Sequence, residues 1–322
     1  MTKQLFGTID GKDVYKYTLS GNGVTVSGIN FGAAVQSIVV DGVETVQSFA
    51  HAEDYKKRGG YVCGAIGRVA NRIADAKFTL DGTTYNVTKN EGNNQLHGGK
   101  VGFNHKFFDV EETDDGVTMT YVSADGEEGF PGKLTFTVKF TLKDRTFRID
   151  YSAVSTKDTV WAPTHHFYFN LNGPVGGANS NILAIYADGY TPVDEELIPL
   201  GKVLPVDGTP FDFRTAKQVG RDKTERGIYD HNFMLNGNHA ATMTGDQSGI
   251  TMDIYTDMPA MQMYTGSGGE EKRTVTDPTD RGGVALEPQF VPNAINMDGF
   301  AKPILKAGET QTHYISLTFA QK

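Results

Sequence analysis

Strict alternation of apolar and polar residues is the feature of this sequence that most constrains its fold. In the segment 134–142, leucine, phenylalanine and valine alternate with threonine and lysine. This is the pattern of a β-strand with one buried face. The segment 147–153 continues the alternation after a turn, and similar segments occur at 24–29, 35–40, 117–122, 250–255 and 314–319. Many short strands of this kind predict a protein built from β-sheets.

Turn signals and the scarcity of helical patterns support the same fold class. Asp-Gly pairs, which favour tight hairpin turns, occur at positions 10–11, 41–42, 81–82, 115–116 and 207–208. Helical periodicity is limited to residues 50–57 and one turn at 215–220, and no linker or fixed-period repeat divides the chain. We therefore expect an all-β fold, a large antiparallel β-sandwich with very few short helices, as a single domain over residues 1–322.

Charge and cysteine content exclude several classes of protein. The 39 acidic and 30 basic residues give a net charge of −9, with no basic run, so binding to nucleic acid or to an anionic membrane is not expected. Cys63 is the single cysteine, which excludes an intramolecular disulfide and a cysteine-rich metal site. No segment approaches the ~18 apolar residues of a membrane helix, and the N-terminus has no apolar run typical of a signal peptide. We expect a cytoplasmic protein.

The densest cluster of chemically active side chains lies in the segment 162–171. Neighbouring side chains of a strand point to opposite faces. One face then carries polar groups, Thr164, His166, Tyr168 and Asn170, and the other carries His165, Phe167, Phe169 and Leu171. A polar stripe within an aromatic-rich strand is typical of a sheet that lines a wet cleft. A hydrogen-bonded histidine in a polar part of the sheet is the alternative interpretation.

A second strand, 283–290, places a carboxylate among apolar residues. Val284, Leu286 and Phe290 are predicted to face the core, and Glu287 points the other way with Ala285 and Gln289. A carboxylate in such a strand is costly unless it is paired or reaches a cleft. The alternative is a glutamate at a sheet edge, in water.

Four other segments combine polar groups with glycine, which lets a backbone approach a ligand closely. They are 67–73, 93–99, 227–233 and 262–269. The glycine-rich end of the last segment, 266–269, does not match a phosphate-binding or dinucleotide fingerprint. His165 and His166 do not form a metal pair, because adjacent strand residues diverge, and no His-Glu-x-x-His motif is present.

Taken together, these segments resemble the aldose 1-epimerase (galactose mutarotase) family. The family pattern runs Gly-Arg-x-x-Asn-Arg-Ile, Leu-His-Gly-Gly, Asn-His-x-Tyr-Phe-Asn-Leu, Asp-x-x-Phe, Gln-x-Tyr-Thr-Gly and Glu-x-Gln. The matching segments keep that order over nearly the whole chain: Gly67–Ile73, Leu96–Gly99, His165–Leu171, Asp230–Phe233, Gln262–Gly266 and Glu287–Gln289. His165 stands where the family usually has asparagine, and alternation turns it away from His166.

The resemblance implies roles for individual residues. His166 matches the general acid of the family, Glu287 its general base, and His97 its second active-site histidine. The residues that match binders of sugar hydroxyls are Asn71, Arg72, Asp230 and Gln262. Tyr168, on the same strand face as His166, is also expected to bind the substrate. The resemblance also implies a large β-sandwich and neither a cofactor nor a metal.

The implied reaction is the interconversion of α and β anomers of a free aldohexose such as galactose or glucose. It needs one base and one acid on opposite sides of a neutral sugar, and a glutamate with a histidine form such a pair near neutral pH. The alternatives are a glycoside hydrolase using Asp230 and Glu287, a non-catalytic carbohydrate-binding protein, and a hexose-phosphate 1-epimerase with Arg68 and Arg72 as phosphate ligands. The preferred sugar, acceptance of phosphorylated sugars, and the choice between monomer and homodimer stay open.

Overall fold

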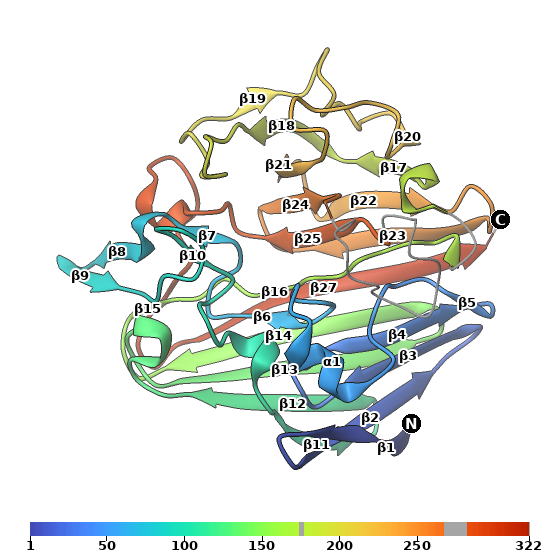
Figure 1. Ribbon diagram of the computed structural model, residues 1–322, viewed down its shortest axis with the longest axis horizontal. Helices are drawn as coiled ribbons and strands as arrows, with labels where there is room; N and C mark the ends of the chain where they lie inside the picture. The colour runs from blue at the N-terminus through green and yellow to red at the C-terminus, as the bar shows by residue number, and fades with distance from the viewer. Residues whose placement is uncertain (174–176, 267–281, 322) are drawn as a thin grey trace.

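The computed structural model describes residues 1–173, 177–266 and 282–321, and it is built mainly from antiparallel sheets (Figure 1). The all-β prediction is confirmed. Three sheets carry most of the structure, one of nine strands and two of five. The helix expected at residues 50–57 is α1 (Ala52–Lys57). The 3-10 turns within the described residues are Ala74–Ala76, Phe103–His105, Glu127–Gly129, Ala178–Ser180 and Ala294–Asn296.

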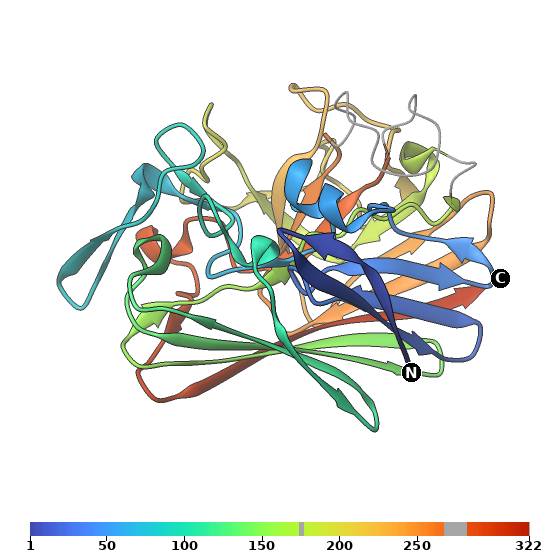
Figure 2. The same cartoon turned by 60° about the horizontal axis from the view of Figure 1, so that its bottom comes forward.

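The green and red strands of the nine-stranded sheet form the long lower layer of Figure 2. Its strands, in spatial order, are β11 (Asp109–Thr113), β12 (Gly116–Ser123), β13 (Leu134–Lys143), β14 (Thr146–Ser155), β27 (Thr310–Gln321), β23 (Ile250–Thr256), β22 (His239–Thr244), β17 (Ile182–Ile185) and β20 (Lys217–Gln218). The alternation read at 134–142 is observed, since Phe136, Val138 and Phe140 are buried whereas Thr135 is exposed. Alternation therefore decides which face of the sheet meets the core.

A five-stranded sheet from the N-terminus packs against this layer. Its strands follow chain order: β1 (Thr2–Ile9), β2 (Lys12–Ser20), β3 (Val24–Ile29), β4 (Val35–Val40) and β5 (Val43–Glu44). Asp10 and Gly11, between β1 and β2, have φ of 51° and 74°, as the predicted hairpin turn requires. Gly28 of β3 lies against Phe140 of β13, where a Cβ atom would stand 2.6 Å from the ring. The absent side chain lets the two sheets approach each other.

The other five-stranded sheet positions the candidate site. Its order is β19 (Leu204–Pro205), β18 (Ala187–Thr191), β21 (Asp230–Leu235), β24 (Ala260–Tyr264) and β25 (Ala285–Gln289). Short paired strands complete the structure: β6 (Ala65–Ile66) with β16 (Thr164–His165), β7 (Arg72–Ile73) with β10 (Gln95–Leu96), β8 (Lys77–Leu80) with β9 (Thr83–Asn86), and β15 (Thr159–Val160) with β26 (Ile304–Leu305).

One hydrophobic cluster joins the three large sheets. It contains Val26 of the N-terminal sheet, Phe140 and Leu317 of the nine-stranded sheet, and Phe233 and Leu286 of the third sheet. Among the described residues, no helix is long and apolar enough to cross a membrane.

The helical turn expected at 215–220 is wrong. Lys217 and Gln218 form β20, which pairs with Ile182 and Leu183 of β17. The Lys217 side chain is buried and its Nζ donates to the Pro210 carbonyl and to Asp222, both at 2.7 Å. Pairing with a distant strand overrides the weak local helical pattern at this edge.

Candidate active site

The segment 162–171 is extended, and it presents its two histidines to opposite sides, as the alternation predicts. Only Thr164 and His165 belong to a regular strand, β16. The backbone is nevertheless anchored, because His166 N–H donates to the Gly64 carbonyl and Cys63 N–H donates to the His166 carbonyl. His165 contacts Phe140 and Phe167 in the core. His166 faces the third sheet instead.

The same segment runs along β25, which brings His166 to Glu287. Phe169 and Val284 exchange two backbone hydrogen bonds of 2.9 and 2.8 Å. The Thr164 hydroxyl donates to the Pro288 carbonyl at 2.7 Å. Between these two anchors, His166 Nε2 lies 3.5 Å from Glu287 Oε1. Both side chains are almost completely buried, with 6% and 2% of their surface exposed. The expected acid and base therefore stand side by side, and not on opposite sides of a sugar as the sequence led us to expect.

His97 completes the cluster through pairing of two other short strands. Antiparallel pairing of β7 and β10 places Leu96 opposite Arg72, so that His97 follows next to Asn71. The His97 ring lies 5.2 Å from that of His166, in an edge-to-face arrangement. Motifs that are about seventy residues apart in the sequence thus meet in one site.

The hydrogen bond to His97 settles which of its nitrogens carries the proton. The backbone N–H of Asn71 donates to His97 Nδ1 at 3.1 Å. Because a backbone amide can only donate, Nδ1 accepts and the neutral ring holds its proton on Nε2. Burial lowers the pKa of His97 well below its usual value, and the charges of His166 and Arg72 lower it further. His97 is therefore a neutral hydrogen-bond donor at neutral pH.

His97, His166 and Glu287 also form the one group of potential metal ligands among the described residues, with ligand atoms within 4.8 Å of one another. A histidine binds a metal through an unprotonated ring nitrogen. In His97, Nδ1 is engaged by Asn71 and Nε2 carries the proton. The cluster fits proton transfer better than the binding of an ion.

A row of polar side chains crosses the third sheet towards this cluster. Strand register places Asn232 of β21 opposite Gln262 of β24, and Gln262 opposite Glu287 of β25. Each is buried, and one oxygen of each has no hydrogen-bond partner among the described residues: Asn232 Oδ1, Gln262 Oε1 and Glu287 Oε2. Buried polar atoms are normally paired. Three unpaired acceptors side by side therefore indicate a place for a ligand that donates hydrogen bonds.

Asp230 lies beside this row and affects the pKa of Glu287. Gln262 Nε2 donates to Asp230 Oδ1 at 2.5 Å, and Arg72 Nη2 lies 4.0 Å from Asp230 Oδ2. Burial raises the pKa of Asp230, and Arg72 opposes that shift. Burial also raises the pKa of Glu287 well above its usual value; the negative charge of Asp230 adds to the increase and Arg72 reduces it.

The two arginines of the segment 67–73 have different surroundings. Arg72 donates from Nε and Nη2 to both oxygens of Glu91, at 2.7 and 2.8 Å, beside Asp230. Arg68 is 1% exposed, and it donates to Ser123 Oγ and to carbonyl groups of the loop around residue 132. Arg68 holds loops together within the core, so the expectation that it could bind a phosphate is wrong.

Two tyrosines frame the histidines. Tyr168 was expected on the His166 side, and its ring lies 4.8 Å from that of His166. Its hydroxyl donates to the Gly60 carbonyl at 3.1 Å. Tyr61 was not expected, but its ring lies 4.5 Å from His97 and 5.9 Å from His166.

Sequence reasoning thus missed Tyr61, Glu91 and Asn232. Asn232 could have been predicted, because it lies two residues from Asp230 on a strand and therefore shares its face. Tyr61 and Glu91 lie in loops, and no local pattern marks them. Of the segment 262–269, residues 267–269 lie outside the described residues.

A cluster of two histidines and a glutamate in a large β-sandwich is the arrangement expected of an enzyme that transfers protons. The family profile described as Aldose 1-epimerase matches residues 15–318. The galactose mutarotase of Sus scrofa is 35% identical, over 99% of this chain and 98% of its own length. The aldose 1-epimerase of Escherichia coli (strain K12) is 36% identical, over 96% and 95%.

A solved structure shows the same fold. The galactose 1-epimerase of Lactobacillus acidophilus NCFM superposes with a TM-score of 0.89 at 27% identity, covering 99% of this chain and 98% of that one. These similarities make the protein an isomerase. The chain belongs to the aldose 1-epimerase family.

Proposed function

We propose that this protein interconverts the α and β anomers of free aldohexoses such as galactose and glucose, with Glu287 as the general base and His166 as the general acid. The observation that carries the proposal is the 3.5 Å approach of His166 Nε2 to Glu287 Oε1 beside a row of unpaired acceptors. The two oxygens that react in an aldose, the anomeric hydroxyl and the ring oxygen, are bonded to the same carbon. Acid and base must therefore converge on neighbouring atoms.

In the forward half of the reaction, the Glu287 carboxylate takes the proton of the anomeric hydroxyl, and His166 gives its Nε2 proton to the ring oxygen. The bond between the anomeric carbon and the ring oxygen breaks, and the electrons of the anomeric oxygen form the aldehyde. Rotation about the adjacent carbon–carbon bond exposes the other face. Ring closure returns both protons. The raised pKa of Glu287 makes its carboxylate a stronger base than an ordinary glutamate.

The remaining residues orient the sugar. His97 offers its Nε2–H to a sugar oxygen, because Nδ1 is occupied by Asn71. Gln262 and Glu287 offer unpaired acceptors to hydroxyl groups. Arg72 and Asp230 hold further hydroxyls, and Asn71 and Tyr168 keep Arg72 and His166 in place, since Asn71 Oδ1 accepts from the Arg72 backbone and Tyr168 packs on the His166 ring.

The other candidate functions are not favoured. A glycoside hydrolase needs no histidine pair, and here the histidines occupy the centre of the site. A hexose-phosphate epimerase needs cations for the phosphate, but Arg68 is buried elsewhere and Arg72 already pairs with Glu91. The intact set of His97, His166 and Glu287 also argues against a purely sugar-binding role.

The proposal extends to the setting of the enzyme. We assign it a single domain over residues 1–322, no nucleic-acid partner, no cofactor or metal, and a monomeric or homodimeric state in the cytoplasm. The shared hydrophobic cluster supports one domain, and the net charge of −9 disfavours nucleic acid. Cys63, the single cysteine, is buried and its thiol donates to the Gln47 carbonyl at 3.3 Å, and a cysteine outside a disulfide suits a reducing compartment.

Polarimetry of freshly dissolved α-D-glucose and α-D-galactose tests the activity. The protein should speed equilibration of both sugars without an added cofactor, and the rate should survive EDTA. Unchanged mutarotation rates for every free aldose tried, or loss of activity after EDTA, would refute the proposal.

A further inference from the structure

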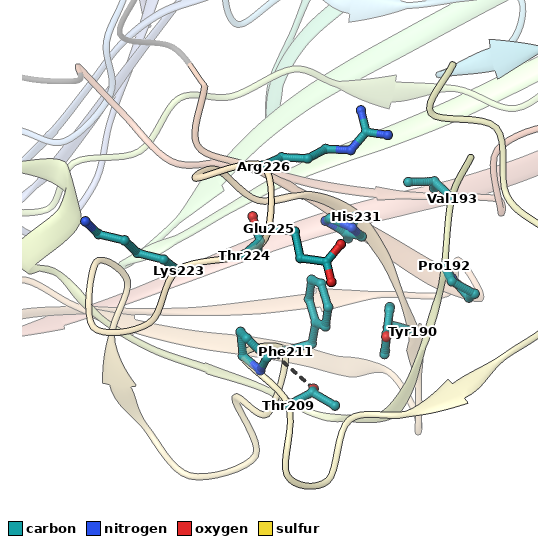
Figure 3. A pocket seen from close by; sticks show the side chains of 11 residues that line it. Tyr190, Pro192, Val193, Thr209, Phe211, Lys223, Thr224, Glu225, Arg226 and His231 are labelled. Carbon is teal, nitrogen blue, oxygen red and sulfur yellow. Dashed lines mark hydrogen bonds between the residues drawn. The ribbon is translucent and has the colours of Figure 1, made fainter. Parts of the chain in front are cut away.

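A pocket of about 410 Å³ lies among β18, β21 and the loops at 209–211 and 223–226 (Figure 3). Its walls combine aromatic and charged groups, including Tyr190, Phe211, His231, Glu225 and Arg226. Pockets of this size commonly hold small molecules. None of these five residues belongs to the candidate active site.

The pocket is on the opposite side of β21 from the candidate active site. Asp230 accepts from Gln262 on the side of Glu287. His231, the next residue of the strand, turns the other way and lies against Phe211, with ring centroids 4.4 Å apart. Neighbouring residues of β21 therefore point to opposite faces, one towards the candidate active site and the other towards this pocket.

Three rings form one wall of the pocket. Phe211 stacks on Tyr190 with centroids 4.1 Å apart and also contacts His231. Tyr190 and Phe211 are only partly buried, so part of their surface remains for a ligand. An aromatic wall of this kind can cover the apolar face of a sugar ring.

His231 supplies a neutral hydrogen-bond donor. The backbone N–H of Asp230 donates to His231 Nδ1 at 3.2 Å, which leaves the proton of the neutral ring on Nε2. Burial lowers the pKa of His231 to about 4, with a further contribution from Arg226, so the ring is neutral at pH 7. No described residue accepts a hydrogen bond from Nε2.

The charged groups argue against a ligand of either sign. Figure 3 shows the carboxylate of Glu225 directed towards the three rings, whereas the Lys223 and Arg226 side chains extend away from them. Glu225 is close enough to raise the pKa of Tyr190, after burial as the larger cause. An anion would meet this carboxylate, and a cation would meet two positive residues on the rim.

We propose that this pocket binds a neutral sugar ring without reacting with it, as a second saccharide site on the back of β21. A hydroxyl both donates and accepts, so it can donate to Glu225 and accept from His231 while the ring lies on Tyr190 and Phe211. The inference rests on the chemistry of the pocket alone, and it holds whether or not the other site interconverts anomers.

The test follows the His231 Cε1–H resonance by NMR in the full-length protein. The probes are methyl β-D-galactoside and methyl β-D-glucoside, whose blocked anomeric oxygen prevents ring opening. We expect a saturable shift of His231 with at least one glycoside. Glu225→Ala should weaken this binding at least tenfold, and Tyr190→Ala should weaken it as well, because both side chains lie at the pocket surface.

Lys223→Ala is the matched control. It removes a charge from the same loop as Glu225, but the Lys223 side chain extends away from the three rings. It should leave the midpoint at His231 unchanged, and none of these variants should change the titration of the His97 resonance. The proposal is overturned if His231 shows no saturable shift, or if its midpoint is the same in Glu225→Ala. Tighter binding of inorganic phosphate or tetramethylammonium than of both glycosides would also overturn it.

Discussion

His165 and His166 are neighbours in the chain, but their surroundings differ completely. His165 is fully buried and both ring nitrogens are occupied: Nε2–H donates to the Ala33 carbonyl at 3.0 Å, and Nδ1 accepts from the Tyr151 hydroxyl at 2.7 Å. Burial lowers the pKa of His165 to about 4. His166 instead faces Glu287 at 3.5 Å, longer than a usual hydrogen bond, beside acceptors that have no partner among the described residues.

The surroundings of the side chain thus separate a histidine that stabilises the fold from one that lies in the candidate site. The two arginines differ in the same way. Arg68 donates to groups that hold loops together, whereas Arg72 lies at the edge of the cluster formed by His97, His166 and Glu287. All four side chains are buried, so neither burial nor residue type separates the members of each pair. A buried side chain whose hydrogen bonds join parts of the fold is structural, whereas one that lies beside unpaired acceptors, such as Gln262 Oε1 and Glu287 Oε2, is a candidate for binding a ligand.

Glu287→Gln should reduce turnover more than any other substitution considered. The amide is nearly isosteric but cannot take the proton of the anomeric hydroxyl, so turnover should fall by at least ~10²-fold. Polarimetry gives the rate, and circular dichroism confirms the fold. Retention of more than a tenth of wild-type turnover would reject Glu287 as the base.

His166→Asn should also lose at least ~10²-fold in turnover, since asparagine cannot donate a proton to the ring oxygen at neutral pH. The amide can still hydrogen-bond, so sugar affinity should change less than turnover. A variant that binds sugar and turns it over at the wild-type rate would remove His166 from the reaction and end the contrast with His165.

The charges around Glu287 predict opposite pH shifts for two neighbouring variants. The base acts in its deprotonated form, so activity rises with pH through the pKa of Glu287, which lies above that of an ordinary glutamate. Asp230→Asn removes a charge that raises this pKa, so the acidic limb of kcat/KM should move to lower pH. Arg72→Ala removes a charge that lowers it, so the limb should move to higher pH.

Both variants should also weaken sugar binding, because both side chains are expected to hold hydroxyls, with some loss of turnover through misplacement. The pH profile separates this effect from electrostatics, since a purely steric role would leave the limb in place. Shifts in the same direction for both variants would contradict the electrostatic account.

The local sequence pattern predicted strands and turns, because these depend on residues that are close together in the chain. Alternation at 162–171 and 283–290 was enough to place His166 and Glu287 on their faces, and the Asp-Gly turn at 10–11 was recognised from its φ preference. Contacts between segments that are far apart in the sequence could not be predicted from it. Tyr61 packs against two histidines, and Arg68 is enclosed by hydrogen bonds to a distant loop. Both arrangements depend on how the sheets pack, which the local sequence pattern does not predict.

His165→Asn, which restores the residue usual in the family, should change the reaction least. Turnover should stay within about tenfold of wild type, or ~1.4 kcal/mol of barrier, because His165 contacts neither Glu287 nor His97. The cost should appear in stability. Asparagine is shorter and cannot satisfy both Tyr151 and Ala33, and a buried group left unpaired costs about 1–3 kcal/mol.

Urea unfolding and polarimetry of His165→Asn and His166→Asn measure the contrast. His165→Asn should lose stability and keep its rate, and His166→Asn should lose its rate. If His165→Asn were the inactive variant and His166→Asn the active one, the assignment of both histidines would be reversed, and the site built on this segment would fall with it.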